Sequence, residues 1–290
     1  MAGRPPMELI RWGSGRVCFE LRSPDAEVMD AARDVFGRWP APQDAPVEGS
    51  WEIRTDDGRF SIDPAPVSPY EGPLPELRSA KQAVTFVEYA AIWQIVENCN
   101  HILAFHSALL SKDGRSVAIV GPSEAGKSTL STALWKSGWT FLCDDTTMAS
   151  GARATPGPRR VSLRETSRSL VGEDLWLSVE NKAGYVKTLA GCLFHPTEAR
   201  DAESSVELSA VIFLKRNGAP QDVTGPTRLV PANAAISLMP YTNLVRQLSF
   251  PDALAPIAEL MSVVPAWDLP RAPLPEMIES VERLAGLRPF

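Results

Sequence analysis

The chain has 290 residues, a formal net charge of −6 and a sequence pI near 5.3, so it lacks the broad positive charge that binding along nucleic acid requires. No apolar run approaches the roughly 18 residues of a membrane-spanning helix, and the first residues lack the apolar core of a signal peptide. The four cysteines are far apart and form no CxxC pair, so they indicate neither a zinc site nor a disulfide framework. We therefore expect a cytoplasmic protein that binds neither nucleic acid nor a membrane.

The first hundred residues predict a small α+β module. Its strands alternate apolar and polar residues, and its helices carry apolar residues at helical spacing. The predicted elements are a strand at 16–21, a helix that follows Ser23-Pro24-Asp25, a hairpin of 51–54 and 59–62, and a helix between Leu77 and Cys99. We place the domain boundary near residue 100, with this module at 1–100 and a larger domain at 101–290.

The larger domain predicts an α/β fold, because short apolar runs alternate with segments of helical spacing. Its first two apolar runs flank Lys112-Asp113-Gly114, which is typical of a hairpin. The predicted strands are 103–110, 116–120, 140–143, 161–163, 191–194 and 210–214, and the predicted helices are 128–138, 251–264 and 275–286.

The segment between the strand that ends at residue 120 and the helix that follows matches a phosphate-binding loop. Two glycines let its backbone turn tightly, so that successive N–H groups can point at phosphate oxygens. Lys127 adds a cation for the β- and γ-phosphates, and the hydroxyl of Ser128 is placed to ligate Mg²⁺. We expect ATP as the nucleotide, with GTP also open. The segment reads Gly121, Pro122, Ser123, Glu124, Ala125, Gly126, Lys127, Ser128 and Thr129.

Two adjacent carboxylates follow the strand at 140–143. We expect this strand to lie next to the strand that leads into the loop, so that Asp144 and Asp145 meet the γ-phosphate. One carboxylate can then face Mg²⁺ while the other accepts the proton of an attacking hydroxyl. We assign Asp144 to the metal and Asp145 to the proton, although the spacing also permits the inverse assignment. Without the loop, the pair would read as a turn cap.

The order of 105–110, the loop and the Asp pair resembles the catalytic core of the HPr kinase/phosphorylase family, which is itself similar to phosphoenolpyruvate carboxykinases. More narrowly, the chain is similar to HPr-kinase-related proteins of bacterial peptide-modification clusters. Weaker resemblance continues through 161–165, 191–196 and 241–243.

The resemblance implies a P-loop core of that family's type, with a mixed sheet and flanking helices. It also implies that His106 lies near the transferred phosphate and that Glu165 supports Mg²⁺. The glycine-rich signature segment that follows the Asp pair in HPr kinases has no counterpart at 164–176. The resemblance therefore does not extend to HPr as the substrate or to the reverse, phosphorylase reaction.

These observations predict an ATP-dependent, Mg²⁺-requiring kinase that phosphorylates a hydroxyl. The acceptor would be a serine of a peptide or small protein, or a small metabolite. The alternative from another class is a nucleotide-responsive binding or scaffold module without turnover. The sequence does not identify the acceptor, and it leaves a homo-oligomer open.

Overall fold

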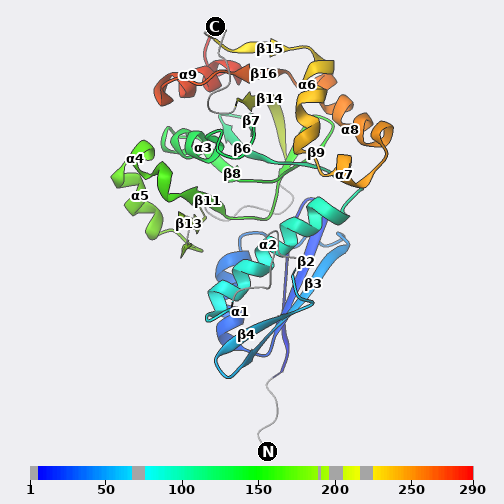
Figure 1. The fold of residues 1–290 in the computed structure, drawn as a ribbon, viewed down its shortest axis with the longest axis vertical. Coiled ribbons are helices and arrows are strands. Elements are labelled where there is room, and N and C mark those ends of the chain that lie inside the picture. The colour runs from blue at the N-terminus through cyan, green and yellow to red at the C-terminus, as the bar shows by residue number, and fades with distance from the viewer. Residues whose placement is uncertain (1–5, 67–75, 189–190, 196–204, 216–224, 290) are drawn as a thin grey trace, which may run out of the picture. The chain divides into compact units, whose positions relative to one another are not determined.

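The computed structural model describes residues 6–66, 76–188, 191–195, 205–215 and 225–289. Among these, the chain divides between Cys99 and Asn100 into two compact units (Figure 1). We call the part up to Cys99 unit 1 and the part from Asn100 onward unit 2.

The described part of unit 1 forms a four-stranded sheet in the order β1-β2-β3-β4, with two helices packed on it. The side chain of Asp25 caps the first helix by accepting the N–H of Glu27, as the Ser-Pro-Asp sequence predicts. The first strand was not predicted. The elements are β1 (Glu8–Ser14), β2 (Val17–Ser23), α1 (Ala26–Phe36), β3 (Val47–Asp56), β4 (Arg59–Asp63) and α2 (Ala80–Asn98).

Within the described residues, unit 2 is built on a mixed sheet of nine strands. Seven follow the order β5-β9-β10-β14-β7-β6-β8, while β16 pairs with β14 and β15 pairs with β16. The strands are β5 (Leu103–Phe105), β6 (Ser107–Lys112), β7 (Arg115–Val120), β8 (Thr140–Cys143), β9 (Thr147–Ser150), β10 (Arg153–Pro156), β14 (Val206–Leu214), β15 (Thr227–Leu229) and β16 (Ala266–Leu269).

Helices cover both faces of this sheet (Figure 1). Alternate residues of β14 explain why, since Ala210 and Ile212 pack in the cluster under α3 and α9, whereas Val211 and Phe213 pack in the cluster under α6 and α8. The helices of these two layers are α3 (Lys127–Lys136), α6 (Pro231–Leu238), α7 (Leu244–Gln247), α8 (Phe250–Val263) and α9 (Leu274–Leu284), with the 3₁₀ turn η2 (Met239–Tyr241) after α6.

A smaller sheet in the order β11-β13-β12 completes the described part of unit 2. It begins directly after the segment that follows β10, and short helices come after its first strand. The elements are β11 (Val161–Arg164), η1 (Glu165–Ser167), α4 (Arg168–Val171), α5 (Glu173–Glu180), β12 (Val186–Lys187) and β13 (Gly191–Phe194).

Two sequence expectations need correction. The strand at 140–143, β8, is not the hydrogen-bonded neighbour of β7, because β6 lies between them. Since β6 is antiparallel to both, β7 and β8 point the same way and their carboxyl ends still reach the same edge. The apolar run at 103–110 is also not one strand, because it breaks at His106 into β5, which pairs with β9, and β6, which pairs with β7.

Candidate functional site

The loop at residues 121–126 joins β7 to α3, in the strand, loop and helix order that the sequence predicts. Gly126 has a φ of +95°, which an L side chain rarely adopts, and it directly precedes α3. A Cβ added to Gly121 would lie 2.8 Å from the carbonyl oxygen of Leu214 on β14, so only glycine fits there. The two glycines are therefore required for the backbone path, and the loop leaves the N-terminus of α3 available to an anion.

Lys127 is buried and folds back over the loop. Its Nζ donates to the carbonyl oxygen of Gly121 at 2.7 Å and to that of Pro122 at 3.3 Å. Burial lowers the pKa of Lys127 to about 8, and the nearby carboxylate of Asp144 opposes that shift. A phosphate near this ammonium group would replace the carbonyl contacts with a charge-assisted one.

Asp144 directly follows β8 and is 3% exposed. Its Oδ2 accepts the hydroxyl of Ser128 at 3.4 Å and the backbone N–H of Ser162 at 3.2 Å. Burial raises the pKa of Asp144, and Arg159 opposes that shift most strongly, followed by the Ser162 N–H. A hydroxyl and a carboxylate oxygen in contact are hard oxygen donors that suit Mg²⁺, so these two residues fit the predicted metal.

The chain makes a tight turn at Asp145, directly after Asp144. The φ of Asp145 is +75°, and the N–H of Thr146 donates to the carbonyl oxygen of Asp144 at 3.0 Å, which closes a three-residue turn around Asp145. Non-glycine residues with positive φ in such turns store strain of about 1–3 kcal/mol and are common at functional sites. The turn gives the adjacent carboxylates different partners.

His106 and Arg159 hold the carboxylate of Asp145. Its Oδ1 lies 2.7 Å from Nδ1 of His106, and its Oδ2 forms an ion pair with the guanidinium of Arg159. Burial lowers the pKa of His106 to about 4, and Lys127 adds to that shift. Because the imidazole is then neutral near pH 7, the contact assigns the proton to Nδ1, which donates to Asp145.

The backbone around His106 is fixed by the segment at 241–243. The N–H of His106 donates to the carbonyl oxygen of Tyr241 at 2.8 Å. The Asn243 side chain accepts the N–H of Ala104 at 2.9 Å and donates to the carbonyl oxygen of Ile102 at 3.0 Å. These bonds tie the end of β5 to the turn after α6, so the position of the imidazole depends on residues far away in sequence.

Sequence reasoning missed Arg159 and the segment that carries it. Residues 157–160 connect β10 to β11, and the segment 157–162, which includes the first two residues of β11, contacts both aspartates through the Ser162 N–H and the Arg159 guanidinium. The available signal was a Gly-Pro turn followed by Arg159 and Arg160 between two predicted strands. No spacing rule links such a turn to the Asp pair.

Two other predicted site residues, Glu124 and Thr129, contact the segment at 164–167, which carries Glu165. Glu124, at a φ of +68°, pairs with Arg164 at 3.2 Å, and the Thr129 hydroxyl lies 2.8 Å from that of Ser167. The side chain of Glu165 is 56% exposed, and its carboxylate pairs with Arg168 at 3.2 Å. Its predicted support of Mg²⁺ stays a prediction.

The described residues contain no cluster of three or more His, Cys, Asp or Glu side chains that could hold a metal. A cation at this site would therefore depend on Ser128, Asp144 and the phosphates themselves. This is how Mg²⁺ is usually bound beside a nucleotide, with few protein ligands.

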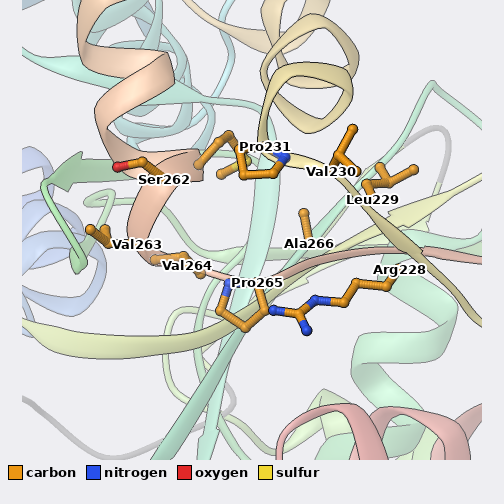
Figure 2. A pocket seen from close by; sticks show the side chains of 10 residues that line it. Arg228, Leu229, Val230, Pro231, Ser262, Val263, Val264, Pro265 and Ala266 are labelled. Carbon is orange, nitrogen blue, oxygen red and sulfur yellow. The ribbon is translucent and has the colours of Figure 1, made fainter.

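A pocket of about 400 Å³ lies elsewhere in unit 2, and none of the predicted site residues lines it. Figure 2 shows the Arg228 side chain extending toward Pro265 below Ala266, with Val230 and Pro231 above. The lining is apolar apart from Arg228 and Ser262 and includes no carboxylate, so it lacks the groups that phosphoryl transfer requires.

The chain is similar to the Hpr(Ser) kinase/phosphatase from Coxiella burnetii, with 18% sequence identity and a TM-score of 0.33, over 63% of this chain and 96% of that chain. A likeness at this level assigns neither an activity nor a substrate. No protein-family model and no curated protein sequence matches the chain. Every helix in the described ranges is too short or too polar to span a bilayer.

Proposed function

We propose that the protein is a kinase that transfers the γ-phosphoryl group of ATP to a hydroxyl group. One observation carries this proposal: the loop hydroxyl of Ser128 lies 3.4 Å from the buried Asp144 carboxylate, while the next residue, Asp145, holds a second carboxylate with other partners. A protein that only binds nucleotide has no need of that second carboxylate. Phosphoryl transfer needs one carboxylate for the metal and one for the nucleophile.

The residues of the loop would bind the nucleotide. The N–H groups of residues 121–127 would surround the β-phosphate, and Lys127 would exchange its carbonyl partners for phosphate oxygens. Ser128 and Asp144 would hold Mg²⁺, which when bound neutralises charge on the β- and γ-phosphates. GTP stays an alternative nucleotide, because no described residue argues for one base.

Asp145 would act on the acceptor. A bond forms between the acceptor oxygen and the γ-phosphorus, and the bond from that phosphorus to the bridging oxygen breaks, leaving its electron pair on ADP. The hydroxyl proton passes to the Asp145 carboxylate. His106, as a neutral donor through Nδ1, would orient that carboxylate without placing a second positive charge against Arg159.

The acceptor class rests on the sequence resemblance to HPr-kinase-related proteins of peptide-modification clusters. It favours a serine of a peptide or small protein, with a small metabolite as the alternative. The absent signature segment argues against HPr as the acceptor.

The test is to incubate the purified protein with ATP and Mg²⁺ and a panel of serine peptides, small proteins and hydroxyl metabolites. Mass spectrometry should detect an added phosphate on one class of acceptor. The matched control is Asp145→Asn, because Asn also tolerates positive φ and should leave ATP binding intact while transfer is lost. ATP binding by the wild type with no transfer to any acceptor would instead support a nucleotide-responsive scaffold.

A further inference from the structure

Arg159 is a buried cation inside the candidate site. It is 8% exposed, and its guanidinium forms an ion pair with Oδ2 of Asp145. Its positive charge also acts on both neighbours, since it opposes the rise in the pKa of Asp144 and adds to the fall in the pKa of His106. The guanidinium therefore contacts Asp145 and lies near enough to Asp144 and His106 to act on their charges, and these are the residues predicted to meet the γ-phosphate.

The local backbone brings Arg159 to this place by a close approach at Gly157. The N–H of Gly157 donates to the carbonyl oxygen of Thr146 at 2.9 Å, and a Cβ on Gly157 would lie only 2.7 Å from that oxygen. The N–H of Arg159 then donates to the carbonyl oxygen of Gly157 at 2.8 Å. Since Thr146 follows Asp145 directly, this turn presses the segment against the Asp pair.

The neighbouring Arg160, in the same segment, has a different kind of contact and serves as a comparison for Arg159. Arg160 is fully buried, and its Nη1 donates to the carbonyl oxygen of Gly184 at 2.7 Å, near the smaller sheet. Arg159 is instead directed at a carboxylate of the candidate site. The Arg159 side chain is 9% exposed and that of Asp145 is 29% exposed, so the guanidinium gives up most of its hydration for this ion pair. Desolvation offsets the attraction between the charges, so the ion pair by itself adds little to stability.

We propose that Arg159 is a further catalytic residue, whose guanidinium contacts the transferred phosphoryl group while it holds the Asp145 carboxylate beside that group. This inference rests on the proposed kinase function. During transfer, negative charge spreads over the equatorial oxygens of the phosphoryl group, and a planar guanidinium can donate to two of them. Arg159 keeps all its protons, and the proton of the acceptor still passes to Asp145.

A purely structural role for Arg159 predicts something different. If it only supported Asp145, its removal would affect the acceptor step and leave the binding of a phosphoryl mimic unchanged. If it contacts the phosphoryl group, its removal weakens binding of that mimic even in the absence of an acceptor. Binding of MgADP with fluoroaluminate, which imitates the phosphoryl group in transfer, separates the two roles.

The experiment measures by calorimetry how much fluoroaluminate tightens the binding of MgADP to the full chain. The variants are Arg159→Gln and Arg159→Lys. The control is Arg153→Gln, because Arg153 on β10 is exposed and donates to the Ser205 hydroxyl at 2.9 Å. We expect the Arg159→Gln variant to bind MgADP almost normally and to lose about 100-fold or more of the tightening. Arg159→Lys should lose about tenfold of the tightening, because an ammonium group lacks the planar pair of N–H donors of a guanidinium.

Equal tightening in the wild type and Arg159→Gln would overturn the inference. If a thermal melt shows that Arg159→Gln is unfolded, the test uses Arg159→Lys instead. Fluoroaluminate tightening in Arg159→Lys equal to that in the wild type would then overturn the inference. A wild type that binds MgADP without any tightening also contradicts the inference, while the transfer assay still tests the kinase function. A wild type that binds neither ADP nor ATP contradicts the kinase proposal itself.

Discussion

The loop at 121–129 contacts Asp144 through Ser128, and the segment at 157–162 contacts both Asp144 and Asp145, yet only the loop has a sequence pattern. The loop needs glycine at both ends because its backbone must bend against β14 and enter α3 at positive φ. The segment supplies an N–H to Asp144 from Ser162 in β11 and a guanidinium to Asp145 from the Gly-Pro turn before that strand. A site can therefore have one half that is dictated by local backbone geometry and another that depends on the tertiary fold.

The largest expected effect comes from Asp144, which both regions contact. Asp144→Asn removes the charge that pairs with the proposed Mg²⁺ but keeps a side chain that can accept from Ser128 and Ser162. We expect transfer to fall about 1000-fold and ATP affinity to lose its dependence on Mg²⁺. Steady-state kinetics and calorimetry over a Mg²⁺ series would measure both quantities.

Asp145→Asn is the matched comparison for Asp144→Asn. It should lose a similar amount of transfer while ATP affinity still rises with Mg²⁺ as in the wild type. If the two variants exchange these behaviours, the metal and the proton roles are inverted, as the sequence alone allows.

Gly157→Ala should displace the segment at 157–162 and leave the structure of the loop at 121–129 unchanged. The added Cβ would lie 2.7 Å from the carbonyl oxygen and 2.9 Å from the Cβ of Thr146, so the turn must shift. We expect a loss of about 1–3 kcal/mol in the free energy of unfolding and up to a 100-fold loss of transfer, because Arg159 and Asp145 move. The control is Gly225→Ala, whose Cβ would meet nothing within 4 Å. Equal behaviour of the two variants would contradict the positioning role of Gly157.

Stability in mild acid tests the environment of His106. Its pKa falls from the ordinary 6.5 to about 4 in the folded chain, so between these values the unfolded chain binds the proton and the folded chain does not. The free energy of unfolding should therefore decrease as the pH falls from 6.5 towards 4. Below pH 4, His106 should contribute no further decrease. Urea titrations should show a shallower decrease for His106→Gln, with His101→Gln as the exposed control. An unchanged slope in His106→Gln would contradict the burial argument.

The smallest expected effect is proton uptake by Lys127. Its pKa is about 8 in the chain without nucleotide, and a bound phosphate should raise that pKa. ATP binding at pH 8 should therefore take up about half a proton, which calorimetry in buffers of different ionisation enthalpy can measure. Lys127→Met should abolish the uptake, and Lys136→Met on the same helix should not. Proton release by the wild type would show that the sign is wrong.

The sequence predicted those strands and helices whose own residues form an apolar run or show helical spacing. Apolar runs located β7, β8 and β14, and helical spacing located α2, α8 and α9. The missed strands β9 and β10 read Thr-Met-Ala-Ser and Arg-Ala-Thr-Pro, which contain no apolar run. The sequence also did not predict the order of the strands in the sheet. The strand β6 lies between β7 and β8, and no local sequence pattern encodes that pairing.

In the candidate site, too, local sequence predicts some contacts, while others depend on the tertiary fold. Ser128 and Asp144 could be linked from sequence, because β7 and β8 are parallel and their carboxyl ends meet at one edge whether or not a strand lies between them. The partners of Asp145 could not be linked in this way. Arg159 depends on the close approach of Gly157 to Thr146, and the imidazole of His106 depends on hydrogen bonds from 241–243, more than a hundred residues away.

The most direct test of the central claim is ³¹P NMR of one sample that contains the protein, ATP, Mg²⁺ and a library of serine peptides. The account predicts a new phosphoester signal that grows as ADP grows, in equal amounts, and that is absent with Asp145→Asn. ATP that remains unchanged while demonstrably bound, or ADP that forms together with inorganic phosphate alone, would contradict transfer to a hydroxyl acceptor.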